Sequence, residues 1–282
     1  MLDQPSLTPL TWARHGRFMW RRFRCYDFAS HMSCVPLAGQ ELSQAVLSLP
    51  IAFQAGPAGW QVVALLGLED GRNLCLDEAG RWQGRYVPAA LRSHPFSVLP
   101  GSPETLCIDE ASPWVVEDYN AEPLFDAPGQ VSAFVASTHD FLKAYEHGRR
   151  QLAERAARLY QAGLLVPWQA CALTDGHQVY RIDESHWQAL DAATWLELRQ
   201  HDVLPLVYAQ LFSQPNLAWL NQRHRAGPAL SPAAAHAMRC TDRSALDAWR
   251  DAMAAESHNE WDVDLNVPGE GSGVLEVPAE KL

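Results

Sequence analysis

The sequence has no long apolar run. Across 282 residues, no stretch approaches the roughly 18 consecutive apolar residues that a membrane-spanning helix requires. The N-terminal residues, MLDQPSLTPLTWARHGRF, contain an early Asp and Pro and no apolar block, so we expect no signal peptide. These absences predict a chain that does not span a membrane.

Paired cysteines and metal-ligand motifs are absent as well. The cysteines show no C-x-x-C pair and no regular spacing, which is typical of reduced thiols in a cytoplasm. The histidines from His15 to His201 lack the close spacing of metal ligands, so we predict no metal site. We expect a cytoplasmic protein whose cysteines are small core residues: Cys25, Cys34, Cys75, Cys107, Cys171 and Cys240.

The sequence also lacks the common motifs of nucleophilic and nucleotide chemistry. There is no G-x-S-x-G turn, no G-x-x-x-x-G-K-[ST] loop, and no G-x-G-x-x-G after a predicted strand. The stretch PGEGSGV, residues 268–274, only imitates a glycine loop. We therefore predict no cofactor.

Positive charge is scarce relative to negative charge. The formal net charge is -11, and ten of the 33 acidic residues lie after Thr241. An acidic chain repels phosphate backbones, which argues against nucleic-acid binding. The end of the chain mixes Gly, Pro and carboxylates without a sustained period, so we predict a domain over residues 1–224 and a linker with an acidic, largely disordered tail over residues 225–282.

What the sequence does have is a change of period between its halves. Up to about residue 124, short apolar runs alternate with turn residues, which predicts strands and hairpins. Residues 60–68 predict a buried strand, residues 73–77 its hairpin partner, and residues 38–50 one inserted helix ended by Pro50.

The second half predicts helices. A long amphipathic helix should be capped by Ser137 and ended by Gly163. A hairpin around residues 175–176 and shorter helices over residues 185–190, 192–201 and 206–212 should follow. The predicted fold class is α+β, with a mostly antiparallel β half containing one helix, then a helical half, around a single core.

Several phrases, in order, resemble the SapC family of bacterial proteins over about residues 12–222. They are VPLAGQEL (35–42), LPIAF (49–53), VALLGLEDGRNL (63–74), GRWQGRYVPAALRSHPF (80–96), LCIDEASP (106–113), EPLFD (122–126), AGLLVPW (162–168) and VLPLVYAQLFSQPN (203–216). The family takes its name from a surface-layer gene cluster. The resemblance implies neighbouring genes for flavin-dependent tryptophan halogenases, cupin-like proteins and TonB-dependent receptors, but no agreed catalytic residues. Some relatives are described as a peptide transporter permease, which the lack of a membrane-spanning segment argues against.

Two Asp-Glu pairs are the weak catalytic candidates. The phrases LCLDEAG (74–80) and LCIDEAS (106–112) place Asp77, Glu78, Asp109 and Glu110 where predicted strands end. Such carboxylates can act as general acid and base if the fold brings them together. We favour the alternative that the two phrases are similar only because each is a strand end followed by a turn, and that their acids are solvated.

Two other stretches have the chemistry of recognition. The stretch RHGRFMWRRFRCY, residues 14–26, interleaves aromatic residues with arginines, among them Arg21, Arg22 and Arg24. A half-buried strand with solvated arginines is the plainer interpretation of it. Residues 80–96 combine apolar anchors with the polar groups of Arg85, Tyr86, Arg92 and His94, and we expect Arg85, Arg92 and His94 to point outward.

These observations favour a non-enzymatic accessory protein that recognises a peptide, a protein or a small aromatic ligand. The resemblance adds a tryptophan-halogenase-like enzyme as a partner to be supported. Two alternatives stay open. One is an enzyme of unknown reaction that uses the clustered carboxylates, and the other is a component of surface-layer assembly or export.

Overall fold

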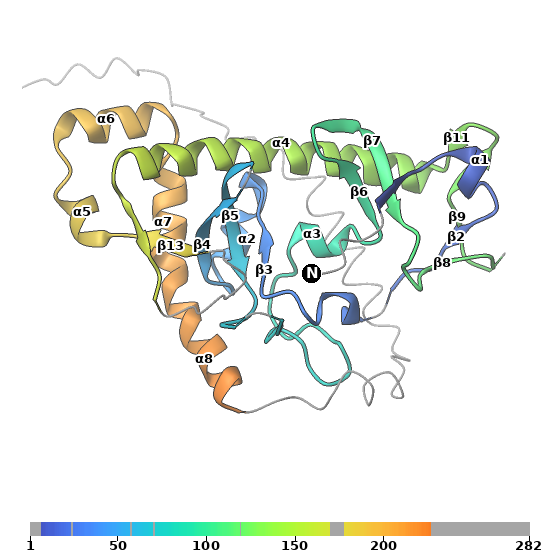
Figure 1. The fold of residues 1–282 in the computed structure, drawn as a ribbon, viewed down its shortest axis with the longest axis horizontal. Helices are drawn as coiled ribbons and strands as arrows, with labels where there is room; N and C mark the ends of the chain where they lie inside the picture. Colours follow the sequence, from blue (N-terminus) through green and yellow to red (C-terminus); the bar gives the residue numbers. More distant parts are fainter. Residues whose placement is uncertain are drawn as a thin grey trace, which may run out of the picture. The chain divides into compact units, whose positions relative to one another are not determined.

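The computed structural model describes residues 7–23, 25–56, 58–69, 71–118, 120–169 and 178–226. Most of the strands lie before residue 132, and helices occupy most of the described chain afterwards, which confirms the predicted α+β class (Figure 1). None of the described helices has both the length and the apolar character needed to cross a membrane. The predicted linker and acidic tail lie almost entirely outside the described residues.

The largest sheet is antiparallel and combines both halves of the chain. Its order is β12-β13-β4-β5-β3, with β12 (Leu165–Pro167), β13 (Val179–Ile182), β4 (Ile51–Gly56), β5 (Gly59–Leu65) and β3 (Cys34–Pro36). Strands β12 and β13 are the predicted second-half hairpin, although its turn lies outside the described residues. The predicted buried strand is β5, whose residues from Val62 onward are fully buried.

The predicted partner of β5 was wrong. Strand β5 pairs with β4 and β3, whereas residues 73–77 form no strand and contribute only an isolated bridge between Leu76 and Trp82. Strand β4 directly precedes β5 and pairs with it along its whole length, from Ile51 to Gly56. Asn73 instead bends residues 73–77. Its side-chain Nδ2 donates to Ala29 O, and its side-chain Oδ1 accepts from Cys75 N.

Three smaller sheets lie in the other part of the fold. One has the order β1-β7-β6, one the order β8-β2-β9, and the third pairs β10 with β11. Their bounds are β1 (Leu7–Pro9), β2 (Met19–Trp20), β6 (Phe96–Leu99), β7 (Ser102–Asp109), β8 (Val115–Val116), β9 (Glu122–Pro123), β10 (Phe125–Ala127) and β11 (Gln130–Val131).

The long helix α4 (Ala133–Gln161) runs along both parts of the fold (Figure 1). Its predicted N-cap was wrong by five residues. Ser132 has an extended backbone and its Oγ accepts from Val135 N, whereas Ser137 lies inside the helix and its hydroxyl donates to Phe134 O. The predicted C-terminal exit is confirmed, since Gly163 has a φ of +69°.

The apolar core, expected to be single, consists of two clusters that α4 connects. The C-terminal half of α4 contributes Leu152, Ala156 and Leu159 to a larger cluster around the five-stranded sheet. Its N-terminal half contributes Val135 and Leu142 to a smaller cluster around β6, β7 and β2. We call these the larger core and the smaller core.

The remaining helices are short. The predicted helix over residues 38–50 is present as η2 (Gly39–Glu41) and α2 (Leu42–Ala45), and the first half also contains α1 (Trp12–His15), η1 (Asp27–Ala29) and α3 (Ala89–Arg92). The three predicted later helices are α5 (Glu184–Gln188), α6 (Ala192–Gln200) and α7 (Leu204–Ser213). The sequence analysis missed η3 (Gln214–Asn216) and α8 (Leu217–Arg225).

Candidate functional site

Residues 80–96, which we call the recognition segment, connect the two cores. Within this segment, Leu91 packs in the larger core and Phe96 packs in the smaller core, and both are almost fully buried, as predicted. Leu91 lies within the short helix α3 (Figure 1), and Phe96 begins β6. The second half of the segment is therefore fixed to both cores, which lowers the entropic cost of binding a ligand.

The start of the segment is attached to two distant parts of the chain. Tyr26 N donates to Gly80 O (2.7 Å), and a Cβ on Gly80 would lie 1.9 Å from the Asp27 carboxylate. Gly80 also has a φ of +70°, so only glycine fits this close approach. From α8, the Arg223 guanidinium donates to Leu74 O and Leu76 O just before the segment.

A buried carboxylate organises the middle of the segment. Glu41 is 3% exposed, and its two oxygens accept from Ala38 N (2.9 Å), Ala89 N (2.7 Å) and the Tyr86 hydroxyl (2.8 Å). Burial raises the pKa of Glu41 above its ordinary value, while these hydrogen bonds and the charge of Arg92 act in the opposite direction. Glu41 thus joins η2 to the N-terminus of α3.

The expectation that Arg92 points outward was wrong. Arg92 is only 7% exposed. Its Nε donates to Val87 O (3.0 Å), and one of its terminal nitrogens donates to the Tyr86 hydroxyl (3.2 Å). The guanidinium also lies 5.6 Å from the ring centroids of Tyr86 and Phe141. Arg92 is buried because the turn of α3 directs it inward, where carbonyl, hydroxyl and ring faces replace water. Arg85 is exposed, as expected. His94 was also expected to point outward, but it is half-buried, because it stacks on Phe28 and contacts Ser112.

The two stretches predicted for recognition meet in one group of rings, which we call the ring cluster. It consists of Phe23, Tyr26 and Phe28 from the first stretch and its continuation, and Trp82 and His94 from the recognition segment. All five residues are half-buried. Phe28 and His94 stack in parallel with centroids 3.9 Å apart, and Tyr26 and Trp82 meet edge to face at 5.9 Å.

The ring cluster is uncharged at neutral pH. Burial lowers the pKa of His94 to about 4, so its imidazole is neutral. Burial also raises the pKa of Tyr26 to about 12, so its phenol stays protonated. A surface of neutral rings binds planar or apolar ligand groups better than it binds a ligand that offers only a charge.

His94 also forms a pair with Ser112, which the sequence analysis did not single out. The two residues approach to 2.9 Å between Nε2 and Oγ, and Ser112 Oγ accepts weakly from Trp114 N (3.4 Å). A nucleophilic serine would need its histidine to be a good base with a carboxylate partner. Among the described residues no carboxylate contacts the His94 ring, so this pair connects the recognition segment to the smaller core rather than forming a triad.

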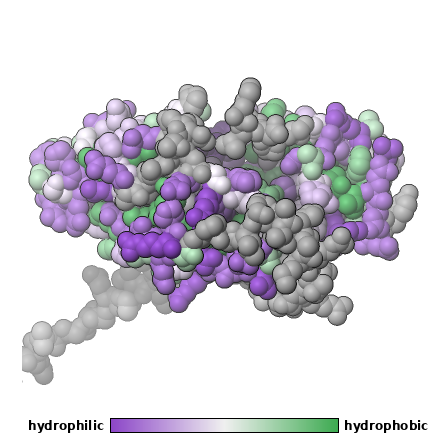
Figure 2. Space-filling model, turned by 60° about the horizontal axis from the view of Figure 1, so that its bottom comes forward, coloured by the Kyte–Doolittle hydropathy of each residue, from purple (hydrophilic) through white to green (hydrophobic). Residues whose placement is uncertain are grey.

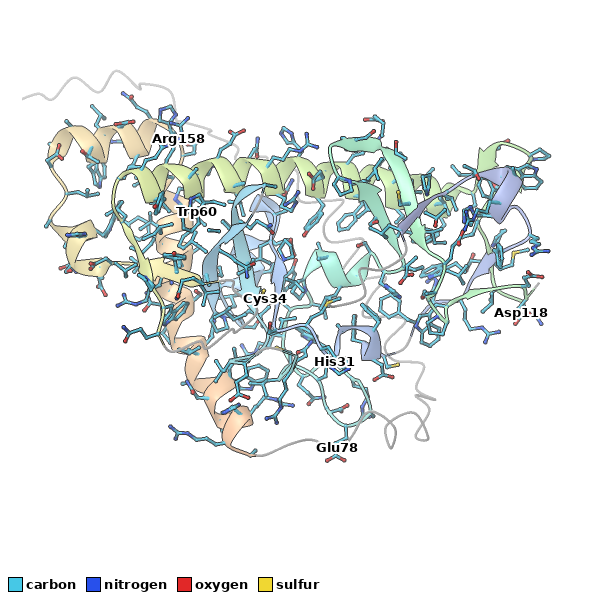
Figure 3. The ribbon with its side chains drawn as sticks, viewed as in Figure 1. His31, Cys34, Trp60, Glu78, Asp118 and Arg158 are labelled. Carbon is cyan, nitrogen blue, oxygen red and sulfur yellow. The ribbon has the colours of Figure 1, made fainter. Side chains whose placement is uncertain are left out.

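The two Asp-Glu pairs have different partners. Asp77 accepts from Ala79 N, Arg81 N, Arg81 Nε and Gln83 Nε2, which closes a tight turn. Glu78 is exposed, and Figure 3 shows it at the tip of this turn. Asp109 accepts from Ala111 N, and Glu110 forms an ion pair with Arg14 and a hydrogen bond with His15. In the part of the chain that the structure describes, no hydrogen bond or ion pair joins one Asp-Glu pair to the other.

The arginines of the first stretch form a ladder of ion pairs with acids that follow β7. The pairs are Arg14 with Glu110, Arg17 with Glu117, Arg21 with Asp118, and Arg22 with Glu122. Arg24 lies outside the described residues. Asp118 marks this end of the fold in Figure 3. The ladder neutralises much of the positive charge that the sequence offered to an anionic ligand.

Other reactive groups are dispersed. Within the described ranges, no three His, Cys, Asp or Glu side chains are grouped as a metal ion would require. The described cysteines are free thiols. Cys75 and Cys107 are fully buried, as predicted, whereas Cys25 and Cys34 are only half-buried, and Cys171 and Cys240 lie outside the described residues. Burial raises the pKa of the Cys75 thiol to about 12, so it is not a nucleophile.

Comparison with known proteins identifies the family. The model of the SapC family matches residues 10–220, and the chain belongs to this family. The match covers both cores, the recognition segment and the ring cluster, and ends within α8 just before Arg223. Searches of curated proteins and of solved structures gave no match.

Proposed function

We propose that this protein is a non-enzymatic, cytoplasmic accessory protein that recognises a peptide, a protein or a small aromatic ligand at the ring cluster. One observation carries the proposal. The two stretches chosen from the sequence for their chemistry, although far apart along the chain, meet in this cluster through contacts of Phe23 with His94 and Tyr26 with Trp82.

The chemistry of the surface agrees with such a ligand. The neutral rings offer apolar contact area at low entropic cost, and the exposed Arg85 can pair with a carboxylate of the bound molecule. Figure 2 shows one face of the protein, where hydrophilic residues predominate and hydrophobic residues occur in smaller areas between them. Small apolar areas with a polar rim are common in binding surfaces that form and separate reversibly.

Membership of the SapC family supports a specific kind of partner. The family resemblance implies that genes for flavin-dependent tryptophan halogenases lie beside genes of this family. We therefore propose a tryptophan-halogenase-like enzyme as the protein partner. The two alternatives from the sequence have less support. The described acids have separate structural partners, and surface-layer assembly depends on the family name alone.

The proposed site can be tested by capture with the full-length protein as bait. Arg85→Glu should reduce the capture of a halogenase-type enzyme from a lysate of the native cell, because it reverses an exposed charge of the recognition segment. Phe23→Leu should reduce capture further, because it removes a central ring but keeps an apolar side chain.

Arg199→Glu is the matched control, since it reverses an exposed arginine on α6. It should capture as the wild type does. Equal capture by all four proteins, with melting temperatures unchanged, would contradict the proposed site.

A further inference from the structure

Helix α7 buries two polar residues beside its apolar ones and exposes two aromatic rings. Gln210 and Ser213 are both 0% exposed, next to the buried Leu206 and Val207, whereas Tyr208 and Phe212 are 43% and 70% exposed. A surface helix normally buries its apolar stripe and presents polar side chains to water. An exposed aromatic stripe on a helix is typical of a contact surface.

The orientation of α7 is fixed by hydrogen bonds. Gln210 Oε1 accepts from Ile182 N and its amide donates to Ile51 O, while Ser213 Oγ accepts from Ile51 N (2.9 Å). These bonds tie α7 to β4 and β13, so the helix cannot roll to bury its aromatic face without leaving buried polar groups unpaired. The exposure of Phe212 is therefore a built feature of the fold.

The outer face extends beyond two rings. The rings of Tyr208 and Phe212 stack with centroids 5.9 Å apart, and Trp187 of α5 meets Tyr208 edge to face at 6.1 Å. Residues 204–219 contain no charged side chain, although charged residues make up 20% of the chain. We call the surface formed by Tyr208, Phe212 and Trp187 the α7 face.

We propose that the α7 face is a contact between two copies of this chain, related by a two-fold axis. A two-fold contact places each patch against the same patch of the other copy, so a patch with a net charge meets a patch of the same net charge. At a net charge of -11, two copies repel each other over most approaches. The α7 face is an exception, because it contributes only neutral aromatic and apolar groups that can pair with themselves.

Such a dimer leaves the ring cluster accessible. Helix α7 packs on β13 and β4, whereas α3 packs on β3 at the other edge of the same sheet. A dimer through α7 would present two recognition segments and would raise the avidity for a partner that is itself dimeric. The dimer and the proposed ligand site can be tested separately, since neither uses the residues of the other.

Sedimentation velocity of the full chain over about 1 to 100 µM, a range that spans typical affinities of reversible dimers, tests the inference. The wild type should shift from monomer to dimer. Phe212→Asp should weaken the dimer roughly a hundredfold or more, because each substitution places two like charges in the contact. Tyr208→Ala should weaken it less.

Tyr160→Asp is the control, because Tyr160 is an aromatic residue of α4 that is 54% exposed. It should dimerise like the wild type. A wild type that remains monomeric throughout, or a dimer that persists unchanged in Phe212→Asp, would overturn the proposal. An unchanged melting temperature in Phe212→Asp would show that loss of the dimer does not come from unfolding.

Discussion

The two cores are built from different side chains. Aliphatic residues dominate the larger core, among them Leu37, Leu49, Ile51, Leu65 and Leu66, all 0% exposed. Rings are more prominent in the smaller core, where Trp20 stacks on Phe134 at 4.4 Å and contacts Phe96 edge to face. The ladder of exposed ion pairs adjoins only the smaller core's strands β2, β7, β8 and β9.

This difference indicates a division of roles. Aliphatic packing across a five-stranded sheet provides dense, non-directional stabilisation. The smaller core adjoins the two-residue strands β2, β8 and β9 and depends more on ring geometry and surface charge. The recognition segment joins the two, so a change in either core should alter its position.

The largest expected effect comes from removing aliphatic volume in α4. Leu159→Ala, in the larger core, should lower the free energy of unfolding by about 4 kcal/mol, because the surrounding sheet cannot collapse into the cavity. Leu142→Ala, in the smaller core, should cost about 2 to 3 kcal/mol, because the more loosely bounded site can relax.

Urea unfolding followed by circular dichroism and by tryptophan fluorescence measures both changes. Coincident transitions would show that the two cores unfold together. A larger cost for Leu142→Ala than for Leu159→Ala would reverse the comparison drawn here.

An intermediate effect is expected at the junction of the cores. Arg92→Ala should lower the free energy of unfolding by about 2 kcal/mol, because it deprives the Tyr86 hydroxyl and Val87 O of a buried donor. The exposed Arg85 provides the comparison. Arg85→Ala should change stability by less than about 0.5 kcal/mol.

Chemical denaturation of the two variants in the same buffer is the measurement. Equal stability of Arg92→Ala and Arg85→Ala would mean that the buried network at Glu41 does not support the segment. A loss of ligand capture in Arg85→Ala alone would separate recognition from folding.

The smallest effect is expected in the ion-pair ladder. The coupling between Arg17 and Glu117, which lie 3.1 Å apart, should be below about 1 kcal/mol in a double-mutant cycle, because both side chains are largely exposed. It should shrink as salt is added, since screening acts on exposed charges. A coupling that is several-fold larger and insensitive to salt would show that the ladder is a main support of the smaller core.

Much of the local structure follows from the sequence. The apolar run at β5, the amphipathic stripe of α4, the left-handed exit at Gly163 and three later helices were all predictable, because each depends on neighbours a few residues away. The two recognition stretches were also chosen from their composition alone.

Tertiary structure decided what these elements do together. Arg92 was expected outside and lies inside, because the chemistry that buries it comes from Val87, Tyr86 and the distant ring of Phe141 on α4. The arginines at residues 14, 17, 21 and 22 meet acids roughly a hundred positions later, which no local pattern encodes. The periods of helices and strands in the sequence indicate which side chains share a face. They do not indicate which side chains are buried or ion-paired, or that Phe23 contacts His94, because these contacts exist only in the folded chain.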